Sequence, residues 1–354
     1  MHGRRSPARN SPDTHNPVLA VLDLGTNNCR LLIARPVGDD RFRAVDSFSR
    51  IVRLGEGVAT TGRISDEAME RTIAALKICA QHIARSDARH VRAVATQAAR
   101  LASNADSLIA RARAEAGIVL EVISAEAEAD LAALGCSPLI GRRYKGALIF
   151  DIGGGSTEII HLARRGTSPG VRGESMRTAT GFPSGDATIK ESGEFEKKFA
   201  ASLPYGVVTL SESHGAAAQS RAGFEKMLAE MRDVFAPYAK QDFDIKHEHL
   251  LGTSGTVTTL AALALQLPRY QRAKVDGSWH ETAHMLRIVE RIAGLDVAAL
   301  AQLGPIGEER ADLMLAGSAI FAAICALWPC RMLRVADRGL REGMLRQMRQ
   351  ELGL

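Results

Sequence analysis

Short apolar runs alternate with amphipathic stretches along most of this 354-residue chain. Near the N-terminus, the runs 19–23 and 29–35 flank a glycine turn and predict the two strands of a hairpin. Residues 43–53 predict a third strand. Ser65 is placed to cap a helix over 66–84, where apolar residues recur at helical spacing. The pattern therefore predicts three strands followed by a helix.

The alternation of strands and helices continues beyond this point. Residues 91–96 and 120–123 predict strands, and each is followed by a predicted helix, over 105–116 and 126–134. Strands that alternate with helices are typical of a layered α/β domain. The basic segment 135–145 contains proline and glycine, so it predicts a crossing between two lobes.

The strand and turn pattern restarts at Ala147. Residues 161–185 are polar and rich in Gly, Ser and Thr, which indicates little regular structure. Residues 203–209 predict another strand, and helical patterns dominate from Arg221 onward. The last helix, over 340–350, is expected to fold back onto the first lobe.

Two lobes and an N-terminal arm follow from this pattern. We predict lobe I over 18–134 together with 331–354, and lobe II over 135–330. Residues 1–17 hold three arginines and three prolines without a separate apolar stretch. They predict a disordered basic arm and not a signal peptide.

Composition is that of a folded enzyme outside a membrane. The chain is 46% hydrophobic and 24% charged, and no apolar run approaches the roughly 20 residues that cross a bilayer. Its five cysteines lack C-x-x-C spacing, which favours a reduced, cytoplasmic location, and Cys29 and Cys79 lie in core-like contexts. The net charge of +5 favours anionic ligands, and it is equally compatible with an incidental basic surface.

Two segments repeat one chemical pattern. Asp23-Leu24-Gly25-Thr26-Asn27-Asn28 follows an apolar run, and so does Asp151-Ile152-Gly153-Gly154-Gly155-Ser156-Thr157-Glu158. In each, a strand ends in an Asp and a turn of glycine and small polar residues follows. Such a turn brings backbone N–H groups close to a phosphate, and the Asp can hold a hydrated divalent cation. Two facing copies would clamp one polyanion between two lobes.

With Gly252-Thr253-Ser254-Gly255-Thr256, these segments resemble the nucleotide-site signatures of the superfamily that contains sugar and acetate kinases, actin and heat-shock chaperone ATPases. More narrowly, the chain resembles the exopolyphosphatase and guanosine pentaphosphate phosphohydrolase family. The matching segments run in family order and are 23–31, 50–57, 95–100, 124–129, 151–158, 203–207 and 337–343. The resemblance implies an α/β fold of two ribonuclease H-like lobes with the active site in the cleft between them.

The resemblance also implies roles for individual residues. Glu128 falls on the position of the family's catalytic base, and Arg100 on that of the Arg that binds the phosphate being removed. Ala125 and Ala127 stand where the family has a Gly and an acid, so Glu126 is the rival base. Asp151 and Glu158 match the acids associated with Mg²⁺. The residues expected to bind phosphate are Asp23, Gly25, Thr26, Asn27, Asn28, Arg30, Gly153, Gly154, Gly155, Ser156, Thr157, Gly252, Ser254 and Gly255.

The resulting functional hypothesis is an exopolyphosphatase that cleaves terminal phosphoanhydride bonds of inorganic polyphosphate with a Glu-activated water and Mg²⁺. The main alternative is hydrolysis of guanosine pentaphosphate, and a small-molecule kinase or an actin-like assembly ATPase comes after it. Polyphosphate is favoured because no aromatic platform for a guanine stands near the glycine-rich loops. We expect the short, two-lobe form of the family, as a homodimer, with no nucleic-acid or membrane partner.

Two histidine-containing segments suggest other chemistry. His280-Glu281-Thr282-Ala283-His284 matches the H-E-x-x-H pattern of zinc peptidases, in which both histidines lie on one helix. No third ligand stands in a suitable context downstream, so we expect these histidines on the polar side of a helix. The cluster His247-Glu248-His249 is expected to form a solvated loop.

Overall fold

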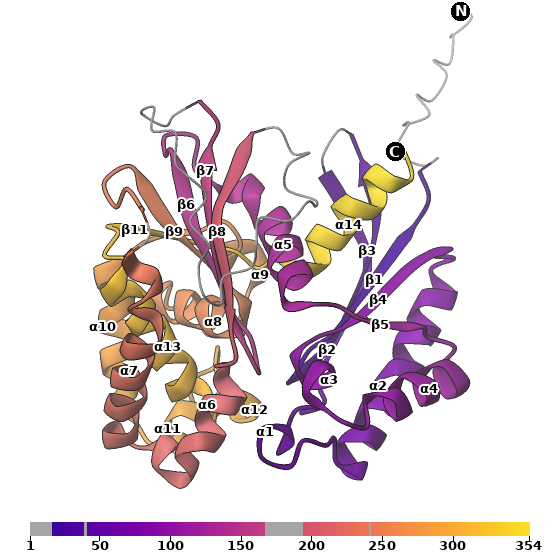
Figure 1. Ribbon diagram of the computed structural model, residues 1–354, viewed down its shortest axis with the longest axis horizontal. Helices are drawn as coiled ribbons and strands as arrows, with labels where there is room; N and C mark the ends of the chain where they lie inside the picture. The colour runs from indigo at the N-terminus through magenta and orange to yellow at the C-terminus, as the bar shows by residue number, and fades with distance from the viewer. Residues whose placement is uncertain (1–15, 39–40, 167–193, 241) are drawn as a thin grey trace, which may run out of the picture.

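The structure is a computed structural model that describes residues 16–38, 41–166, 194–240 and 242–354. Two lobes lie side by side, each built around one mixed β-sheet (Figure 1). Two helices from distant parts of the chain lie between the sheets in the same view.

The first sheet has the strand order β3-β2-β1-β4-β5. Its strands are β1 (Leu19–Leu24), β2 (Asn28–Val37), β3 (Arg41–Ile51), β4 (His90–Ala95) and β5 (Leu120–Val122). β1 pairs antiparallel with β2 and parallel with β4, so it lies in the middle of the sheet. A central strand must be apolar on both faces, and this is why β1 is a nearly continuous hydrophobic run.

The second sheet repeats this arrangement. Its strands are β6 (Gly146–Ile152), β7 (Thr157–Arg164), β8 (Phe195–Leu203), β9 (Glu248–Thr253), β10 (Trp279–Glu281) and β11 (Met332–Val335). The order β8-β7-β6-β9-β11 matches the first sheet strand for strand, and β10 adds an edge beyond β11. The prediction of two ribonuclease H-like lobes is confirmed by this repeated order.

Helices of lobe I cover one face of the first sheet. They are α1 (Val58–Thr61), α2 (Asp66–Arg85), α3 (Gln97–Leu101) and α4 (Ala105–Ala116). The Ser65 hydroxyl accepts a hydrogen bond from the Ala68 amide at the start of α2, as the sequence predicts. Ile73, Leu76 and Cys79 on α2 are buried in the core of this lobe.

Helices of lobe II share one hydrophobic core with one face of the second sheet. They are α6 (Val207–His214), α7 (Arg221–Phe235), α8 (Ser254–Ala264), α9 (Arg272–Val275), α10 (Thr282–Ala293), α11 (Val297–Ala301), α12 (Glu308–Ala311) and α13 (Met314–Leu327). α13 is buried along nearly its whole length, because almost all of its residues are apolar.

The two helices between the sheets are α5 (Ala125–Cys136) and α14 (Leu340–Glu351), which lie against each other (Figure 1). α5 follows a strand of the first sheet, but Ala129 and Ala133 pack in the core under the second sheet. α14 follows a strand of the second sheet, but Met344 and Leu345 pack on the first sheet. Each lobe is therefore completed by a helix that follows a strand of the other.

This exchange corrects the predicted lobe boundaries. β11 belongs to the second sheet, although 331–354 was assigned to lobe I, and α5 packs on the second sheet, although it falls within 18–134. The predicted crossing 135–145 also begins too early, since α5 continues to Cys136. The expectation that the last helix folds back onto lobe I is confirmed.

Two further predictions of secondary structure were wrong. Residues 203–209 do not form a strand, because β8 ends at Leu203 and α6 begins at Val207. Pro204 has no N–H group for a sheet ladder, which is consistent with the end of the strand there. Residues 161–164 belong to β7 and are regular, whereas 167–185 of that polar segment and 1–15 of the basic arm lie outside the described residues.

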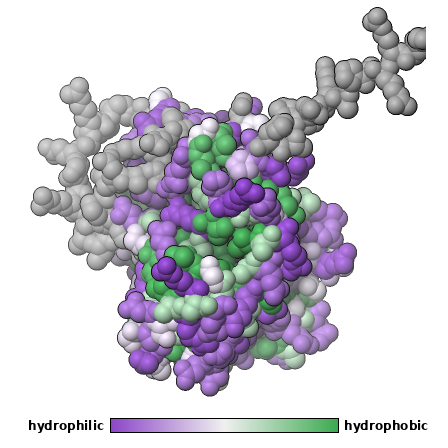
Figure 2. Space-filling model, turned by 90° about the vertical axis from the view of Figure 1, so that its right-hand side faces the viewer, coloured by the Kyte–Doolittle hydropathy of each residue, from purple (hydrophilic) through white to green (hydrophobic). Residues whose placement is uncertain are grey.

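All five cysteines are buried with free thiols, and the Sγ atoms of Cys29 and Cys79 lie 3.9 Å apart in the lobe I core. No helix in the described ranges is both long and apolar enough to cross a lipid bilayer. Figure 2 shows one face with a hydrophobic area bordered by hydrophilic surface. Exposed apolar side chains of the molecule include Val119 and Val122 at the edge strand β5.

Candidate active site

The two repeated segments form matching turns that face each other across the lobes. Leu24 pairs with Cys29 and Ile152 pairs with Thr157, so each hairpin closes on a four-residue turn. In both turns the first amide donates to the fourth carbonyl over 2.9 Å: Gly25 to Asn28, and Gly153 to Ser156. The duplication therefore extends to the hydrogen bonds of the loops.

The two turns approach each other so closely that Gly154 and Gly155 of the second turn leave no room for a side chain. A Cβ added at Gly154 would lie 3.0 Å from the Asn27 amide nitrogen, and one at Gly155 would lie 2.5 Å from Thr26 Oγ1. Glycine is needed at these positions because another backbone approaches closely. The loops thus form one continuous floor across the lobe boundary.

Backbone amides of both loops are available to a ligand. The carbonyl groups of the loops accept hydrogen bonds from neighbouring segments. The Gly55 amide donates to the Thr26 carbonyl over 2.8 Å, and the Val208 amide donates to the Gly154 carbonyl over 2.8 Å. Within the described residues, the amides of Thr26, Asn27, Gly154 and Gly155 have no acceptor, and Thr26 Oγ1 has no partner either. Successive backbone N–H groups that have no acceptor can make an anion-binding concavity.

A cleft of about 150 Å³ lies over this floor, lined by both lobes. Most of the predicted site residues line it: Asp23, Gly25, Thr26, Asn27, Asn28, Arg30, Glu128, Asp151, Gly153, Gly154, Gly155, Ser156, Glu158, Ser254 and Gly255. The cleft between the lobes is therefore where the sequence places the active site.

Three predicted site residues are not among those that line the cleft. Thr157 is fully buried and its hydroxyl donates to the Tyr205 carbonyl over 2.6 Å. Gly252 packs against the ring of Phe150, where a Cβ would come within 2.6 Å of the ring. Both positions hold the loops in place, so the expectation that they bind phosphate is not supported. Arg100 is the third, and it contacts Glu128 instead.

The third predicted loop leads into α8. Ser254 has a left-handed backbone with φ of +81°, which is rare outside glycine and clusters at functional sites. Its hydroxyl contacts the Gly255 amide and the Ile152 carbonyl, which ties α8 to the second phosphate loop. The N-terminus of α8 thereby lines the cleft, and its dipole favours an anion there.

Glu128 is held at the cleft by an arginine. Arg100 Nη1 lies 2.8 Å from Glu128 Oε2 and 2.9 Å from the Ile123 carbonyl. The Gln97 side-chain oxygen accepts from Arg100 Nη2 over 2.7 Å and fixes the guanidinium. Glu126 does not line the cleft. The geometry thus favours Glu128 over Glu126 as the base.

Acidic side chains are concentrated in this cleft. Burial, helped by the charges of Asp23 and Asp151 and opposed by Arg100, raises the pKa of Glu128 to about 7. Burial raises the pKa of Asp151 to about 6 and the pKa of Glu158 well above its usual range. The pKa of Asp23 is also raised by burial. These four carboxyl groups have raised pKa values and lie in one cleft. A positive charge in the cleft would stabilise their ionised forms.

These carboxylates suit a magnesium ion that keeps its waters. Among the described residues, no three Asp, Glu, His or Cys side chains converge on one point as direct metal ligands. Mg²⁺ is usually bound through one or two carboxylates while it retains several waters, and the oxygen donors of Asp151 and Glu158 fit that chemistry. Ser202 already donates to Glu158 Oε1 over 2.8 Å, which orients that carboxylate.

Neither histidine segment forms a site of its own. His280 lies in β10, where its Nε2 is 2.9 Å from the Ser278 hydroxyl, and the helix begins only at Thr282. The two histidines of the H-E-x-x-H pattern therefore do not share a helix. The expectation of a solvated loop at 247–249 was wrong, because Glu248 and His249 are buried in β9 and Glu248 pairs with His161 over 3.0 Å. The pattern of apolar and polar residues along β9 does not predict the buried pair of Glu248 and His161.

Three arginines that the sequence analysis did not propose also line the cleft, and one of them is Arg338 in the loop before α14. Arg310 comes from α12, and Arg341 from the first turn of α14. The segment 337–343 was noted as a match to the family, but nothing in the local pattern marks one of its arginines as facing the cleft.

The comparisons with known proteins agree with this geometry. The family model described as "Ppx/GppA phosphatase family" matches residues 32–352, which is most of the chain. The chain belongs to the Ppx/GppA phosphatase family. The predicted relationship is thereby confirmed, and the matched residues include the second repeated turn, the helix that carries Glu128, and α14.

Relatives within Ppx/GppA carry two kinds of name. "Exopolyphosphatase 2" of Mycobacterium tuberculosis is 31% identical over 85% of this chain and 88% of the relative. "Guanosine-5'-triphosphate,3'-diphosphate pyrophosphatase" of Vibrio vulnificus is 28% identical over 96% of this chain, which spans 60% of that protein. The crystal structure of the Aquifex aeolicus family member superimposes with a TM-score of 0.72 at 26% identity, over 96% of this chain and 99% of that one.

Proposed function

We propose that this protein is an exopolyphosphatase that hydrolyses terminal phosphoanhydride bonds of inorganic polyphosphate. One observation carries the proposal: Glu128, a carboxyl group with a pKa of about 7, lines the same cleft as two facing phosphate loops. A base with that pKa is half-ionised near neutral pH and suits water activation. The similarity to an exopolyphosphatase over 88% of its length supports the same activity.

The geometry suggests how the residues divide the reaction. The amides of Thr26, Asn27, Gly154 and Gly155 hold the terminal phosphoryl group, and Glu128 accepts a proton from the attacking water. The water oxygen forms a bond to phosphorus while the bridging P–O bond breaks, so that orthophosphate and a chain shorter by one phosphate leave. Arg100 positions Glu128, and direct contact of Arg100 with the phosphate stays a prediction. A bound Mg²⁺ would supply positive charge over the phosphoryl oxygens, held by Asp151 and Glu158.

Guanosine pentaphosphate is the second candidate substrate, because relatives of comparable similarity are named for its hydrolysis. The cleft favours polyphosphate: the described residues that line it include no Phe, Tyr or Trp on which a guanine could stack. We expect a higher kcat/KM for polyphosphate, measured as orthophosphate release from both substrates side by side in Mg²⁺. A higher value for guanosine pentaphosphate would reverse the choice.

Activity should depend on pH through Glu128. The base works only when deprotonated, so kcat/KM should rise about tenfold per pH unit below the pKa of Glu128 and level off above it. The midpoint is expected at or below about 7, since a bound cation favours the carboxylate. A profile of kcat/KM from pH 5.5 to 8.5, at roughly constant substrate ionisation, tests this. The Glu128→Gln variant should lose the rise, and a flat profile for the native enzyme would contradict the assignment.

Other predictions from the sequence concern the oligomeric state, the location, the partners and the metal ion, and these remain predictions. A homodimer, a cytoplasmic location and the absence of nucleic-acid partners are expectations that sedimentation, fractionation and binding assays would check. The same holds for Mg²⁺ as the preferred ion, which is tested by phosphate release in a series of divalent cations after treatment with a chelator.

A further inference from the structure

In each lobe, the chain runs against the phosphate loop directly after the third strand. In lobe I, β3 leads into 52–57, from which two amides donate to the Asn27 carbonyl over 2.9 and 3.0 Å. In lobe II, β8 leads into 204–212, from which the Val207 amide donates to the Gly153 carbonyl over 2.9 Å. We call these two stretches the supporting segments. Because each one bonds to the carbonyl groups of its loop, its position sets the position of that loop.

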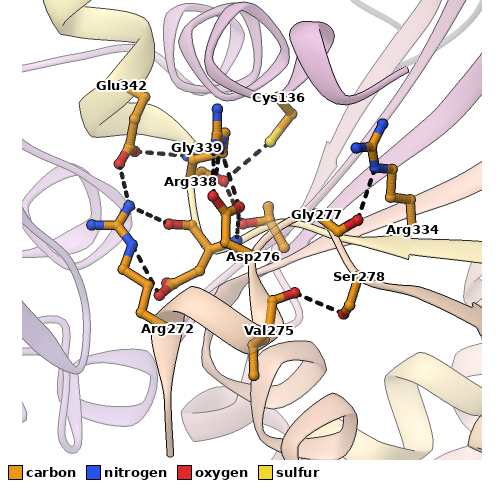
Figure 3. Close-up of polar contacts among 12 residues, drawn as sticks. Cys136, Arg272, Val275, Asp276, Gly277, Ser278, Arg334, Arg338, Gly339 and Glu342 are labelled. Atoms are coloured by element: carbon orange, nitrogen blue, oxygen red, sulfur yellow. Dashed lines mark hydrogen bonds and ion pairs between the residues drawn. The ribbon is translucent and has the colours of Figure 1, made fainter. Parts of the chain in front are cut away.

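The two phosphate loops are close together but are not bonded to each other. Within the described ranges, no hydrogen bond joins 25–28 to 153–156. The lobes are joined elsewhere by the packing of α5 on α14, and the ion pair of Arg338 with Asp276 fixes the segment before α14 (Figure 3). The spacing between the loops therefore depends on contacts outside the loops.

The supporting segment of lobe I contacts lobe II at two points. Arg53 Nη2 lies 3.0 Å from Asp312 Oδ2, and the Gly57 amide donates to Glu212 Oε1 over 2.9 Å. Asp312 follows α12, and Glu212 lies on α6 in the supporting segment of lobe II. In Figure 1, α1, α6 and α12 lie at the lower end of the lobes, away from α5 and α14. The lobes are thus joined by polar contacts at this end and by helix packing at the other.

These contacts line a second cavity, of about 230 Å³, at the lobe boundary. Asn27 lines both this cavity and the cleft, so the first phosphate loop borders the two. Arg53, Glu212 and Asp312 line the second cavity and not the cleft. A change in these side chains therefore reaches a ligand in the cleft through the loop.

Stability alone does not explain these contacts. The Arg53 and Asp312 side chains are 39% and 27% exposed, and an ion pair with such exposure contributes little to stability. Arg53 also has a left-handed backbone with φ of +48°, which is unfavourable outside glycine and clusters at functional sites. Glu212 Oε2 and Asp312 Oδ1 are buried and, among the described residues, accept no hydrogen bond, which costs free energy. The arrangement therefore indicates a role in positioning.

We propose that the contacts of Arg53 with Asp312 and of Glu212 with the Gly57 amide form a clamp that sets the spacing of the two phosphate loops. The three side chains are positioning residues, because they act through the supporting segments. The inference rests on the proposed function for the reaction, in which both loops hold one phosphoryl group while water attacks it. A displacement of about 1 Å in such an arrangement lowers the rate by about 100-fold.

The kinetics of Arg53 variants test the clamp. With polyphosphate and Mg²⁺, Arg53→Met should lower kcat by about 10- to 100-fold and change KM by less than about threefold, because each loop keeps its own amides. Arg53→Lys keeps the charge and should recover part of kcat. A merely structural pair would lower the unfolding temperature and leave kcat as it was. Equal kcat in Arg53→Met and the native protein would overturn the proposal.

Lys77→Met is the matched control for these variants. Lys77 pairs with Glu115 over 2.8 Å, and the two side chains are 48% and 32% exposed, which is similar to the clamp pair. Both residues belong to lobe I, on α2 and α4. Lys77→Met should therefore leave kcat within about twofold.

Two substitutions of Glu212 test the second contact. Glutamine keeps a side-chain oxygen that can accept the Gly57 amide, so Glu212→Gln should keep kcat within about threefold. Glu212→Ala removes the acceptor and should lower kcat as Arg53→Met does. The double variant of Arg53→Met with Glu212→Ala should be at most about threefold slower than the slower single variant, because residues of one unit are not additive. If the two losses multiplied, the contacts would act independently and the clamp would be wrong.

Hydrogen exchange distinguishes failure of the clamp from failure of the proposed function, since it needs no substrate. The amides of 52–57 that bond to the first loop should exchange about tenfold faster in Arg53→Met than in the native protein, and at an unchanged rate in Lys77→Met. If the native protein releases no phosphate from polyphosphate while exchange responds in this way, the function is wrong and the clamp stands. If polyphosphate is hydrolysed and Arg53→Met changes neither kcat nor exchange, the function stands and the clamp is wrong.

Discussion

Replacing Glu128 with glutamine is expected to lower the rate of polyphosphate hydrolysis by about 10²–10⁴-fold, which is the usual contribution of a general base. Glutamine has nearly the same volume and can still accept the hydrogen bond from Arg100 Nη1, which lies 2.8 Å from Glu128 Oε2. It cannot take a proton from water. The substrate should therefore bind as before while kcat falls, which steady-state kinetics and calorimetry would measure separately.

Glu126→Gln is the matched control for this experiment. Glu126 lies in the same first turn of α5 but does not line the cleft, so its replacement should leave kcat within about twofold. If Glu126→Gln lost the activity and Glu128→Gln kept it, the base would have to be moved two residues upstream. The α5 helix would then have to turn in the complex to bring Glu126 into the cleft.

Replacing Gly343 with alanine is expected to lower the free energy of unfolding by about 1–3 kcal/mol, because it forces α5 and α14 apart. A Cβ at Gly343 would lie 1.9 Å from the Leu131 carbonyl oxygen, and one at Gly135 would lie 2.0 Å from the Gly339 carbonyl oxygen. Both obstacles are backbone atoms, so no side chain can move aside. Activity should fall as well, since α5 carries Glu128. Chemical denaturation and phosphate release measure the two effects.

Gly294→Ala provides the comparison for that substitution. Gly294 ends α10 with φ of −88°, and a Cβ there would meet only the Arg291 carbonyl oxygen, at an ordinary 3.6 Å. Its replacement should change the free energy of unfolding by less than about 0.5 kcal/mol. If Gly343→Ala were equally harmless, the close crossing of α5 and α14 would not be a constraint on this fold.

Short sequence patterns predicted the helices whose first and last residues are marked by capping residues or glycine. The helix 105–116 has the predicted bounds, and the helix after Ser65 ends within one residue of its predicted end. Both repeated turns also form as the sequence predicts, because an Asp at a strand end and a run of small residues specify a turn locally. These features depend on residues a few positions apart, which is why a sequence pattern contains them.

The sequence by itself determined which residues gather at the cleft: the turns of the two repeated segments, their aspartates and Glu128 all line it. Only the tertiary structure decided that α5 and α14 exchange lobes, since an apolar helix face does not record which sheet will cover it. The tertiary structure alone also shows that burial brings the pKa of Glu128 to about 7 and that Arg272 donates to Glu342, 70 residues further along the chain. Desolvation and long-range charge pairing depend on groups far apart in the chain, so they arise only once the chain has folded.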